Sequence, residues 1–591
     1  MPESRSIPPR VWLFAALALA TAVVVIIGPA LFDRFTLNVL TRSMIYAMLA
    51  VTVDILWGYT GILTFGQAAF FGTGAYTSAM VLSHLGSTPA LLALALALAI
   101  IVPVLLGAFV GWLSFGHGST PLYATVISLV VPIVVTQLVF SGGVWTGSSS
   151  GLVGYSGLPL GLPGYFRLTG ICLIVTTVVA LVFTRSDAGK LLVAIRDNEA
   201  RCAYLGLDPQ RLKIVLTTIL AGVAGIAGFL YANASGVVAP ENTGFVFGTE
   251  IVIWTALGGR GTIIGPVMGA IGIDYLSAQL SGDLPFLWNL VVGTLFVVMI
   301  ILLPNGLAQL ARMALPRRSA QQTNDAGSSP AIAVASAGSG RPGDNRVLSV
   351  SGLGKAFGSL QVLQGIDLDV RPGELVSLVG PNGAGKTTLM RCLSDGTEAT
   401  TGSISIAGQD INGMTPDEIV ALGVGRKFQV ASVFDSLTVA DCLRMARASR
   451  QAPSLLRRSA TLGLPSAAAD ILRSTGLDQM LGRPVSLLSH GQKQSLELAM
   501  VVALEPKLIL LDEPTAGLTK VERTTIGATL QKLTGELGFA AILVEHDLDF
   551  VRDISTRIVV LHQGKLVLDG SVAEVVNSET VRTIYSGAAH A

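Results

Sequence analysis

The sequence predicts two units, a polytopic α-helical membrane domain of about ten spans followed by a soluble α/β domain. The first observation is a run of 112 residues, 55–166, without any Asp, Glu, Lys or Arg. A soluble surface would be charged and a disordered segment would be polar, so this apolar run favours a membrane. The second is the uneven distribution of charged side chains, with 24 in residues 1–316 and 53 in the remainder. The third is a glycine-rich loop between a strand and a helix at residues 375–389.

Ten apolar stretches come near the roughly 20 residues that a bilayer requires. The first, Val11–Phe32, exceeds the apolar core of a signal peptide and no cleavage site follows it, so we expect a retained helix. Phe245–Leu257 is short and suits a tilted or broken span. The other expected spans are Thr36–Trp57, Ile62–Leu82, Pro89–Leu113, Leu122–Phe140, Leu168–Thr184, Leu212–Ala232, Ile263–Leu280 and Pro285–Leu303.

The positive-inside rule gives the expected orientation of these spans. Basic residues gather between Arg185 and Lys213 and again in residues 312–318, which places both segments on the cytoplasmic side. Six spans before the first segment and four after it put both termini in the cytoplasm. Arg34 and Arg42 argue mildly against this orientation.

Three acidic residues, Asp54, Glu250 and Asp274, fall in or beside apolar spans. A charge at the bilayer centre costs about 2.5–3.5 kcal/mol on insertion scales, so such a residue faces a partner or a cavity, or else lies at the membrane interface. Both interpretations remain open from the sequence. The segment Gly142–Gly164 lacks charge and periodicity and suits an extracytoplasmic or re-entrant loop.

Two further segments shape the domain organisation. Residues 186–206 combine apolar positions near helical spacing with charged faces, which predicts an amphipathic helix that docks on a soluble partner or lies on the membrane surface. Residues 317–345 are rich in Ser, Gly, Ala, Gln and Asn and predict a flexible linker of roughly 30 Å. We therefore expect a membrane domain at 1–316 and a second domain at 346–591. The four cysteines show no paired spacing and indicate reduced thiols.

The second domain contains a P-loop in its required strand–loop–helix context. The strand is Leu375–Val379, and the helical run is expected from Leu389. The glycines let backbone N–H groups turn toward phosphate oxygens, and the helix N-terminus adds its positive end. Lys386 supplies a positive charge to the β/γ-phosphates, and the Thr387 hydroxyl can ligate Mg²⁺. The residues expected to hold the nucleotide are Gly380, Asn382, Gly383, Gly385, Lys386, Thr387 and Thr388.

Acidic residues and a histidine follow two other apolar strands. Strand 508–511 ends in Asp512, placed to hold Mg²⁺ through water, and Glu513, placed to polarise an attacking water as general base. A structural ion pair is the alternative, but acids rarely follow a buried strand without a metal or base role. His546 follows the strand 541–544 and can contact the γ-phosphate.

Together with the sequence Leu-Ser-His-Gly-Gln at 488–492, these residues resemble the nucleotide-binding domain of ABC transporters over about Val347–Ser586. The resemblance implies ATP as the nucleotide. It also implies that Phe357 stacks on adenine, that Gln429 is the Q-loop residue beside Mg²⁺, and that His546 is the switch histidine.

The resemblance further implies that Ser489, Gly491 and Gln492 form the signature that closes on the γ-phosphate of an opposite domain. Two residues depart from the family pattern: His490 replaces the usual second glycine of the signature, and Thr519 replaces the usual aspartate of the D-loop. Both departures put in doubt the equivalence of two composite ATP sites.

The membrane half resembles the permeases of bacterial branched-chain amino acid and urea ABC importers over most of residues 40–307. The resemblance rests on Gly58–Gln67, Gly74–Thr77, Ala194–Glu199, Gly258–Thr262 and Pro304–Leu307. Within that group, residues 250–254, 258–261, 425–429 and 488–492 look more like the urea type. The segment Lys190–Gly206 would then be the coupling helix that docks on an ATPase domain.

Taken together, the residues predict an ABC ATPase fused to its permease, one half of an importer in the bacterial inner membrane. Its cargo would be a small polar nitrogenous solute, either a branched-chain amino acid or urea or a short amide. The resemblance implies a second permease subunit, a second ABC ATPase subunit, an extracytoplasmic solute-binding protein and membrane lipid as partners, and no nucleic acid.

Two alternatives compete with the importer. One is an ABC exporter, which usually has six long spans with charged cytoplasmic extensions. The charge-free run and about ten spans argue against it. The other is an ATP-driven regulator of a membrane complex that transports nothing.

Overall fold

The computed structural model describes residues 21–116, 121–280, 288–302, 306–307, 331–335, 346–399, 401–579 and 581. The first half of the expected span Val11–Phe32, the ends of Pro285–Leu303, the basic segment 312–318 and most of the expected linker lie outside these residues. The chain divides into two units. The first comprises Met1–Gly189 and Gln210–Gln322, and the second comprises Lys190–Pro209 and Thr323–Ala591. The second unit therefore includes a segment that interrupts the sequence of the first.

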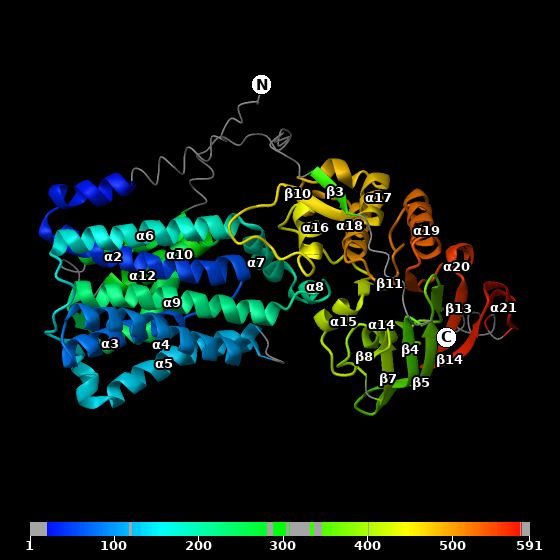
Figure 1. Cartoon of the computed structure of the whole chain (residues 1–591), viewed down its shortest axis with the longest axis horizontal. Coiled ribbons are helices and arrows are strands. Elements are labelled where there is room, and N and C mark those ends of the chain that lie inside the picture. The colour runs from blue at the N-terminus through cyan, green and yellow to red at the C-terminus, as the bar shows by residue number, and fades with distance from the viewer. Residues whose placement is uncertain are drawn as a thin grey trace, which may run out of the picture. The chain divides into compact units, whose positions relative to one another are not determined.

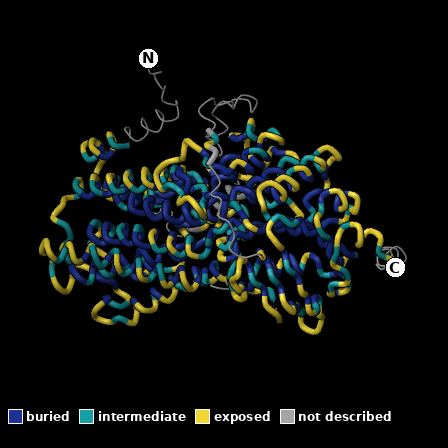
Figure 2. Tube along the Cα trace, turned by 45° about the vertical axis from the view of Figure 1, so that its right-hand side comes forward, coloured by how far each residue is buried: buried dark blue, intermediate teal, exposed yellow. Residues whose placement is uncertain are grey.

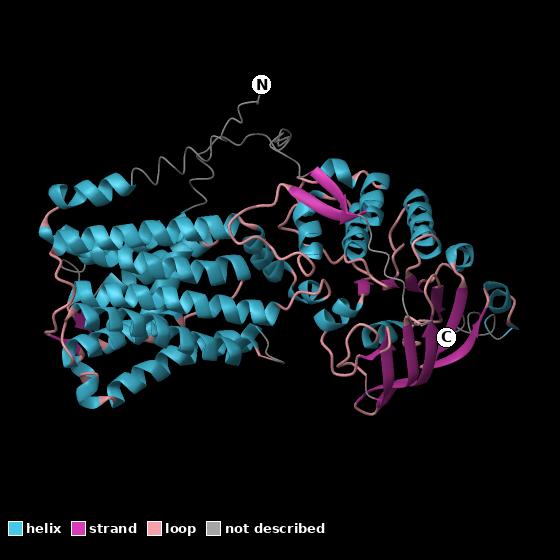
Figure 3. Cartoon of the chain, in the orientation of Figure 1, coloured by secondary structure: helices cyan, strands magenta, loops and turns pink. Residues whose placement is uncertain are grey.

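The first unit consists of helices that run side by side (Figures 1 and 3). They are α2 (Arg34–Asp54), α3 (Gln67–His84), α4 (Pro89–Phe115), α5 (Pro121–Ser141), α6 (Leu162–Arg185), α9 (Pro209–Ser235), α10 (Phe245–Gly258), α11 (Ile264–Leu280) and α12 (Trp288–Leu302), with a helical segment Thr21–Leu31 before them. Within the described residues, 5 helices are long and apolar enough to cross a membrane: α2 with its π-helical extension Ile55–Tyr59, and α4, α5, α6 and α9. The membrane domain is thus helical, as predicted.

Helix α2 forms the centre of this unit. Of the 18 most apolar consecutive residues of α2 and its extension, 89% are buried, whereas the corresponding share for α4 is 22%. Ile45, Leu49 and Ala50 are fully buried on it. Buried segments run through the interior of each unit in Figure 2, and the exposed ones lie at its edges. The buried helix α2 carries the polar residues Arg42, Ser43 and Asp54, whereas the more apolar α4 is the more exposed of the two, as expected where a helix face meets lipid.

Asp54 at the end of α2 has a structural role. Its carboxylate accepts hydrogen bonds from the backbone N–H groups of Gly261 and Ile263, the latter at 2.9 Å. These groups precede α11, so Asp54 holds the start of that helix against the end of α2. The approach is close, since a Cβ on Gly58 would lie 2.4 Å from the Gly261 nitrogen. Of the two interpretations left open for Asp54, its burial and these backbone partners favour a residue that faces a partner inside the bundle over one at the membrane interface.

The segment Gly142–Gly164 contains short ordered elements. They are η2 (Gly143–Trp145), η3 (Ser148–Ser150) and β1 (Leu152–Val153), which pairs antiparallel with β2 (Val237–Val238) before η4 (Pro240–Thr243). Asn233 of α9 accepts the N–H of Leu158 at 3.0 Å. Helix α6 begins at Leu162, six residues before the expected Leu168, because Pro163 occupies its first turn, where a missing N–H does no harm.

The second unit contains a six-stranded sheet in the order β14-β13-β6-β12-β11-β9 and a four-stranded antiparallel sheet in the order β5-β4-β7-β8. The first sheet has parallel neighbours from β13 to β9, with only β13 and β14 antiparallel. Its strands are β6 (Leu375–Val379), β9 (Val424–Lys427), β11 (Leu508–Asp512), β12 (Ala540–Val544), β13 (Arg557–His562) and β14 (Lys565–Gly570). The second sheet comprises β4 (Leu348–Phe357), β5 (Leu360–Val370), β7 (Thr401–Ile406) and β8 (Gln409–Asp410).

Helices complete the second unit (Figure 1). The α-helices are α14 (Lys386–Cys392), α15 (Pro416–Leu422), α16 (Val439–Arg447), α17 (Ser466–Ser474), α18 (His490–Ala503), α19 (Lys520–Gly535), α20 (Leu548–Ile554) and α21 (Val572–Val576). Two short 3₁₀ helices, η5 (Leu477–Met480) and η6 (Val485–Leu487), lie between α17 and α18. The segment from the first domain adds most of α7 (Asp187–Asp197) and all of α8 (Glu199–Ala203). The expected α/β fold of the second domain is therefore confirmed.

The carboxyl ends of the parallel strands gather the residues singled out in the sequence. Strand β6 leads into Gly380, β11 ends at Asp512, β12 precedes Glu545, and β9 precedes Phe428. Strands β6, β11 and β12 are buried along their whole length. Open parallel sheets bind ligands at this edge, because loops there are free to diverge while the strands stay fixed.

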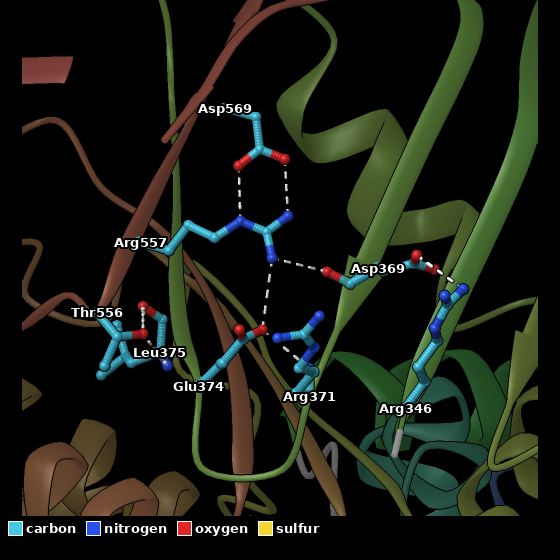
Figure 4. A network of polar contacts seen from close by, with 8 residues as sticks. All are labelled: Arg346, Asp369, Arg371, Glu374, Leu375, Thr556, Arg557 and Asp569. Atoms are coloured by element: carbon cyan, nitrogen blue, oxygen red, sulfur yellow. Dashed lines mark hydrogen bonds and ion pairs between the residues drawn. The ribbon is translucent and has the colours of Figure 1, made fainter. Parts of the chain in front are cut away.

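A polar network holds the opposite, amino end of the same sheet (Figure 4). Arg557 of β13 binds Asp569 of β14 through two hydrogen bonds of 2.6 and 2.7 Å, and donates to the backbone oxygen of Asp369 on β5 at 3.1 Å. The backbone N–H of Leu375 donates to the Thr556 hydroxyl at 2.9 Å. The first residue of β6 is therefore fixed, and with it the strand that carries the P-loop.

One strand lies inside the expected linker. β3 (Ala331–Ala335) pairs in parallel with β10 (Thr461–Pro465), from Ala331 opposite Thr461 to Ala335 opposite Pro465. This short part of the linker is thus attached to the second unit by main-chain hydrogen bonds.

Candidate nucleotide-binding and hydrolysis site

The P-loop turns tightly between β6 and α14. Gly380 has φ +154°, and a Cβ there would lie 2.0 Å from the backbone oxygen of Leu561. Gly385 adopts a left-handed conformation as the N-cap of α14. The helix starts at Lys386 rather than at the expected Leu389, because the Leu389 N–H already bonds to the Gly385 oxygen at 2.9 Å. The predicted phosphate cradle therefore opens directly onto a helix N-terminus.

Lys386 lies at the centre of this loop. Its side chain is buried, and Nζ donates to the backbone oxygens of Gly380 at 2.8 Å and Pro381 at 3.0 Å. An ammonium has three protons to donate, so one remains for a phosphate oxygen. Burial lowers the pKa of Lys386, while the Glu513 and Asp512 carboxylates oppose that shift. Asn382, Gly383 and Thr387 are exposed on the loop and the first helical turn, and Thr388 is half-buried beside them.

The structure brings together three residues that the sequence placed far apart. Glu513 Oε2 accepts a hydrogen bond from Gln429 Nε2 at 2.9 Å, and Glu513 Oε1 lies 2.6 Å from His546 Nε2. Glu513 has φ +44°, a conformation that costs a non-glycine residue about 1–3 kcal/mol. Its N–H bonds to the Val544 oxygen at 2.9 Å, which holds the strained backbone in place. Both carboxylate oxygens are thus oriented by predicted site residues.

Asp512 immediately precedes Glu513 but lies in a different environment. It is 4% exposed at the end of β11. Burial raises the pKa of Asp512, and the Arg426 guanidinium opposes the shift most strongly among its charged neighbours. Neighbouring carboxylates with contrasting environments fit different roles, one as a buried metal ligand and one as an accessible base.

Sequence reasoning gave no role to two charged groups around the site. Arg426 is buried on β9 and donates to the Ser394 hydroxyl at 2.6 Å. Glu545 is also buried and accepts the backbone N–H of Thr515 at 3.0 Å and its hydroxyl at 2.6 Å, which fixes the loop after β11. The sequence signal for Glu545 was an acid directly after an apolar strand, whereas nothing in the short strand Val-Gly-Arg-Lys singled out Arg426.

The signature residues lie at the start of α18. Ser489 caps this helix by accepting the Gln492 N–H at 3.2 Å, and the Gln492 side chain accepts the Ser489 N–H at 3.0 Å. A Cβ on Gly491 would lie 2.2 Å from a carboxylate oxygen of Glu522. Glu522 accepts the Thr519 hydroxyl at 2.8 Å, so the signature and the D-loop position pack together. Within the described residues, these side chains form no hydrogen bond with the P-loop.

The predicted adenine contact, Phe357, lies at the end of β4. Its side chain is 49% exposed, and Lys355 Nζ lies 4.9 Å from the ring centre. Leu360, its partner across the β4–β5 turn, is 66% exposed. An exposed ring at a strand end is available for stacking.

The segment 190–209 reaches the site through Arg201. This side chain is 0% exposed, and its guanidinium donates to the Arg426 backbone oxygen at 2.8 Å and lies 3.4 Å from Glu497 of α18. Glu497 also accepts the Phe428 N–H at 3.1 Å and lies 4.0 Å from Lys427 Nζ. Arg201 thereby contacts Arg426 directly and the Phe428 backbone through Glu497, just before Gln429.

Further contacts of the same segment surround the buried pair of Arg201 and Glu497. Asp197 accepts the Ser436 N–H at 2.8 Å and its hydroxyl at 3.0 Å, and Asn198 donates to the Ser432 hydroxyl at 3.0 Å. The Tyr204 ring packs edge-on against Phe428 with centres 5.0 Å apart. Of the two interpretations of segment 186–206, these contacts favour docking on the soluble domain over lying on the membrane surface.

Comparison with known proteins assigns both parts of the chain. Residues 35–303 match the family described as the branched-chain amino acid transport system permease component, and residues 363–516 match the ABC transporter family. The ATPase part is similar to the high-affinity branched-chain amino acid transport ATP-binding protein BraF of Pseudomonas aeruginosa. The two are 34% identical over 252 residues, which is 41% of this chain and 98% of that protein.

The protein named LivG in Escherichia coli K12, which carries the same description, is likewise 34% identical over 253 residues, covering 41% of this chain and 98% of LivG. Among solved structures, a nucleotide-free ATP-binding cassette from an ABC transporter matches 41% of this chain and 98% of its own, with 24% identity and a TM-score of 0.35. The chain belongs to the ABC transporter family, with a permease domain of the branched-chain amino acid transport type fused to an ABC ATPase domain.

Proposed function

We propose that this chain is one half of an importer that uses ATP hydrolysis to carry a branched-chain amino acid across the bacterial inner membrane. The permease family and the names of the ATPase relatives support this cargo, and they do not favour an exporter. The observation that carries the proposal is a chain of contacts that runs from Arg201 through Glu497 to the Phe428 backbone, and from the adjacent Gln429 to Glu513. These contacts connect a segment of the permease sequence to the carboxylate that we expect to act in hydrolysis.

The residues present fit Mg·ATP. Thr387 at the start of α14, Gln429 and, through water, Asp512 would hold Mg²⁺, which would neutralise phosphate charge. Lys386 and the backbone N–H groups of the P-loop bind and orient the phosphates. Glu513 accepts the proton of the attacking water, while Gln429 and His546 hold its carboxylate in the productive orientation.

The proposed partners are a second permease subunit, a second ABC ATPase subunit, an extracytoplasmic solute-binding protein and the surrounding lipid. Ser489, Gly491 and Gln492 would close on ATP held by the second ATPase. The ATPase domain and both termini would lie in the cytoplasm. His490 lies beside Gly517 in this chain, since a Cβ on Gly517 would be 3.4 Å from its ring. The unusual signature residue therefore belongs to the face that we expect to meet the second ATPase.

Reconstituted transport tests the function. The chain is assembled with its partner subunits in proteoliposomes, with ATP on the side of the ATPase domain and the solute-binding protein on the opposite side. Labelled leucine should accumulate on the ATPase side, and only when both ATP and the solute-binding protein are present. Uptake of urea without leucine would contradict the proposed cargo. Outward movement, or ATP hydrolysis without flux, would contradict the importer itself.

Phe357→Ala should weaken ATP binding about 5- to 150-fold, since stacking of a base on an aromatic ring contributes about 1–3 kcal/mol. Phe357→Tyr should keep the affinity of the wild type. Isothermal titration calorimetry with ATP measures both affinities, with Leu360→Ala as the matched control from the same hairpin. Equal affinities for all four proteins would exclude Phe357 from the adenine contact.

A further inference from the structure

Arg42 and Asp274 form an ion pair within the membrane domain. Arg42 Nη2 lies 3.0 Å and Nε 3.3 Å from the two carboxylate oxygens of Asp274, which also accepts the Ser43 hydroxyl at 2.6 Å. The Asp274 side chain is 7% exposed, whereas that of Arg42 is 42% exposed. The buried carboxylate therefore has hydrogen-bond partners for both of its oxygens. Its two bonds to Arg42 fix the orientation of the guanidinium, which is partly exposed at the surface of the unit.

The guanidinium retains donors for a further ligand. Arg42 presents five N–H donors, and its bonds to Asp274 engage Nε and Nη2. Its other terminal nitrogen, Nη1, has no hydrogen-bond partner among the described residues. Arg42 lies roughly 12 Å along α2 from the start of that helix, at 1.5 Å per residue, and thus within the apolar span rather than at its end.

Glu250 on α10 supplies an opposite charge. It is exposed between Thr249 and the buried Ile251, within a helix of 14 residues that is otherwise free of charge. Its carboxylate has no hydrogen bond or ion pair among the described residues. Three residues before it and four after it on α10, Phe247 and Trp254 pack against Tyr46, the ring that lies under the Arg42 guanidinium. An unpaired carboxylate in hydrocarbon costs about 2.5–3.5 kcal/mol or more, so Glu250 requires water or a cationic ligand beside it.

A rigid aromatic cluster supports these charged groups. The Tyr46 ring lies under the Arg42 guanidinium at 5.9 Å. It stacks on Tyr231 of α9 at 5.8 Å and packs against Phe247 at 5.0 Å and Trp254 at 5.7 Å, both on α10. Because α2, α9 and α10 meet in this cluster, the positions of Arg42 and Glu250 are fixed relative to one another, as a preorganised site requires.

We propose that Arg42 and Glu250 form a subsite of the transport path that binds the charged backbone of a free amino acid. Arg42 Nη1 receives the α-carboxylate, Glu250 receives the α-ammonium, and Asp274 and Ser43 position the guanidinium. The inference rests on the proposed import function and names the residues that would recognise the two charges of its substrate. A zwitterion satisfies both charges at once, whereas neutral urea or an amide leaves both unpaired, at the cost of desolvating them.

Analogues that lack one charge test each contact. The assembled transporter in nanodiscs, without solute-binding protein, is titrated with leucine, with leucinamide, which lacks the carboxylate, and with 4-methylpentanoate, which lacks the ammonium. The wild type should bind leucine about 10- to 150-fold more tightly than either analogue, the range of one charge-assisted hydrogen bond. Glu250→Gln should remove the preference over 4-methylpentanoate and keep the preference over leucinamide. Arg42→Gln should do the reverse.

The controls separate this subsite from other roles. Glu241→Gln, at an exposed acid of η4, should change neither preference. Glu250→Gln is a conservative change at an exposed position, so it keeps the test valid even if loss of Arg42, which leaves Asp274 unpaired, prevents folding. An equal loss for all three ligands, or loss of the second permease subunit on size exclusion, would assign both residues a structural role and overturn the proposal. Transport of leucine with unchanged preferences in Glu250→Gln would overturn the subsite alone, and a wild type that carries no leucine would overturn the proposed function with it.

Discussion

Glu513→Gln lowers steady-state ATP hydrolysis by about 10²- to 10⁴-fold, the contribution of a positioned general base, and leaves ATP affinity unchanged. The amide has the size of the carboxylate and stays within reach of Gln429 and His546, but it cannot take up the proton of the attacking water. The P-loop contacts of Lys386 do not depend on it. Phosphate release and nucleotide titration measure the two quantities, and uptake should fall in parallel with hydrolysis.

Glu536→Gln is the matched control, since it makes the same chemical change at an exposed position after α19. His546→Ala provides a second test, because it removes the 2.6 Å contact that orients one Glu513 oxygen while leaving the base in place. Its hydrolysis should fall less than that of Glu513→Gln. Sustained hydrolysis and uptake by Glu513→Gln would show that another group accepts the proton.

Arg201→Gln separates ATP hydrolysis from transport. It leaves Glu497 and Lys427 buried without the guanidinium, and removal of one partner of a buried ion pair costs about 3–5 kcal/mol. Segment 190–209 should therefore dissociate from the ATPase, so that uptake is lost while basal hydrolysis persists. The number of leucine molecules transported per ATP hydrolysed measures this coupling. Deletion of Lys190–Gly206 should have the same effect.

A double-mutant cycle identifies the contact responsible. Glu497→Gln alone should also lower the coupling ratio, and the double variant should lower it less than the product of the two single effects. Arg196→Gln is the control from the same segment, since its side chain is 36% exposed and its contact with the Ser436 hydroxyl lies at the edge of the docked surface. If Arg201→Gln and the deletion both transported at the wild-type ratio, segment 190–209 would have no part in coupling.

Periodicity and local motifs predicted the elements well, because both depend on neighbouring residues. Apolar stretches placed α2, α4, α5 and α9 within a few residues of their ends. The start of α6 was misplaced because Gly161, Leu162 and Pro163 lie in a glycine-rich loop by composition but begin a helix in the structure. The P-loop and the strand ends placed Lys386, Asp512 and Glu513 at one edge of the sheet.

Long-range pairings could not be predicted from one sequence. Arg42 and Asp274 are separated by 232 residues, and Arg201 and Arg426 by 225. Hydropathy marks each of these side chains as costly where it lies, but it does not name the partner. The left-handed backbone of Glu513 is equally invisible, since no glycine marks it. Tertiary packing imposes this conformation against the preference of the residue.

The burial of Arg201 inside the ATPase unit has a consequence for the order in which the protein is made. Its segment leaves the ribosome before any residue of the ATPase, because domains emerge from the N-terminus onward. When the ATPase domain folds, Glu497 and Lys427 therefore meet a segment that is already present in the same polypeptide. The effective concentration of that segment is set by the length of the linker and not by diffusion of a separate subunit. A separately encoded ATPase would have to find that surface in competition with every other cassette in the cell. Because the two domains are fused, each permease domain is synthesised together with an ATPase domain, and only the partner subunits have to be recruited.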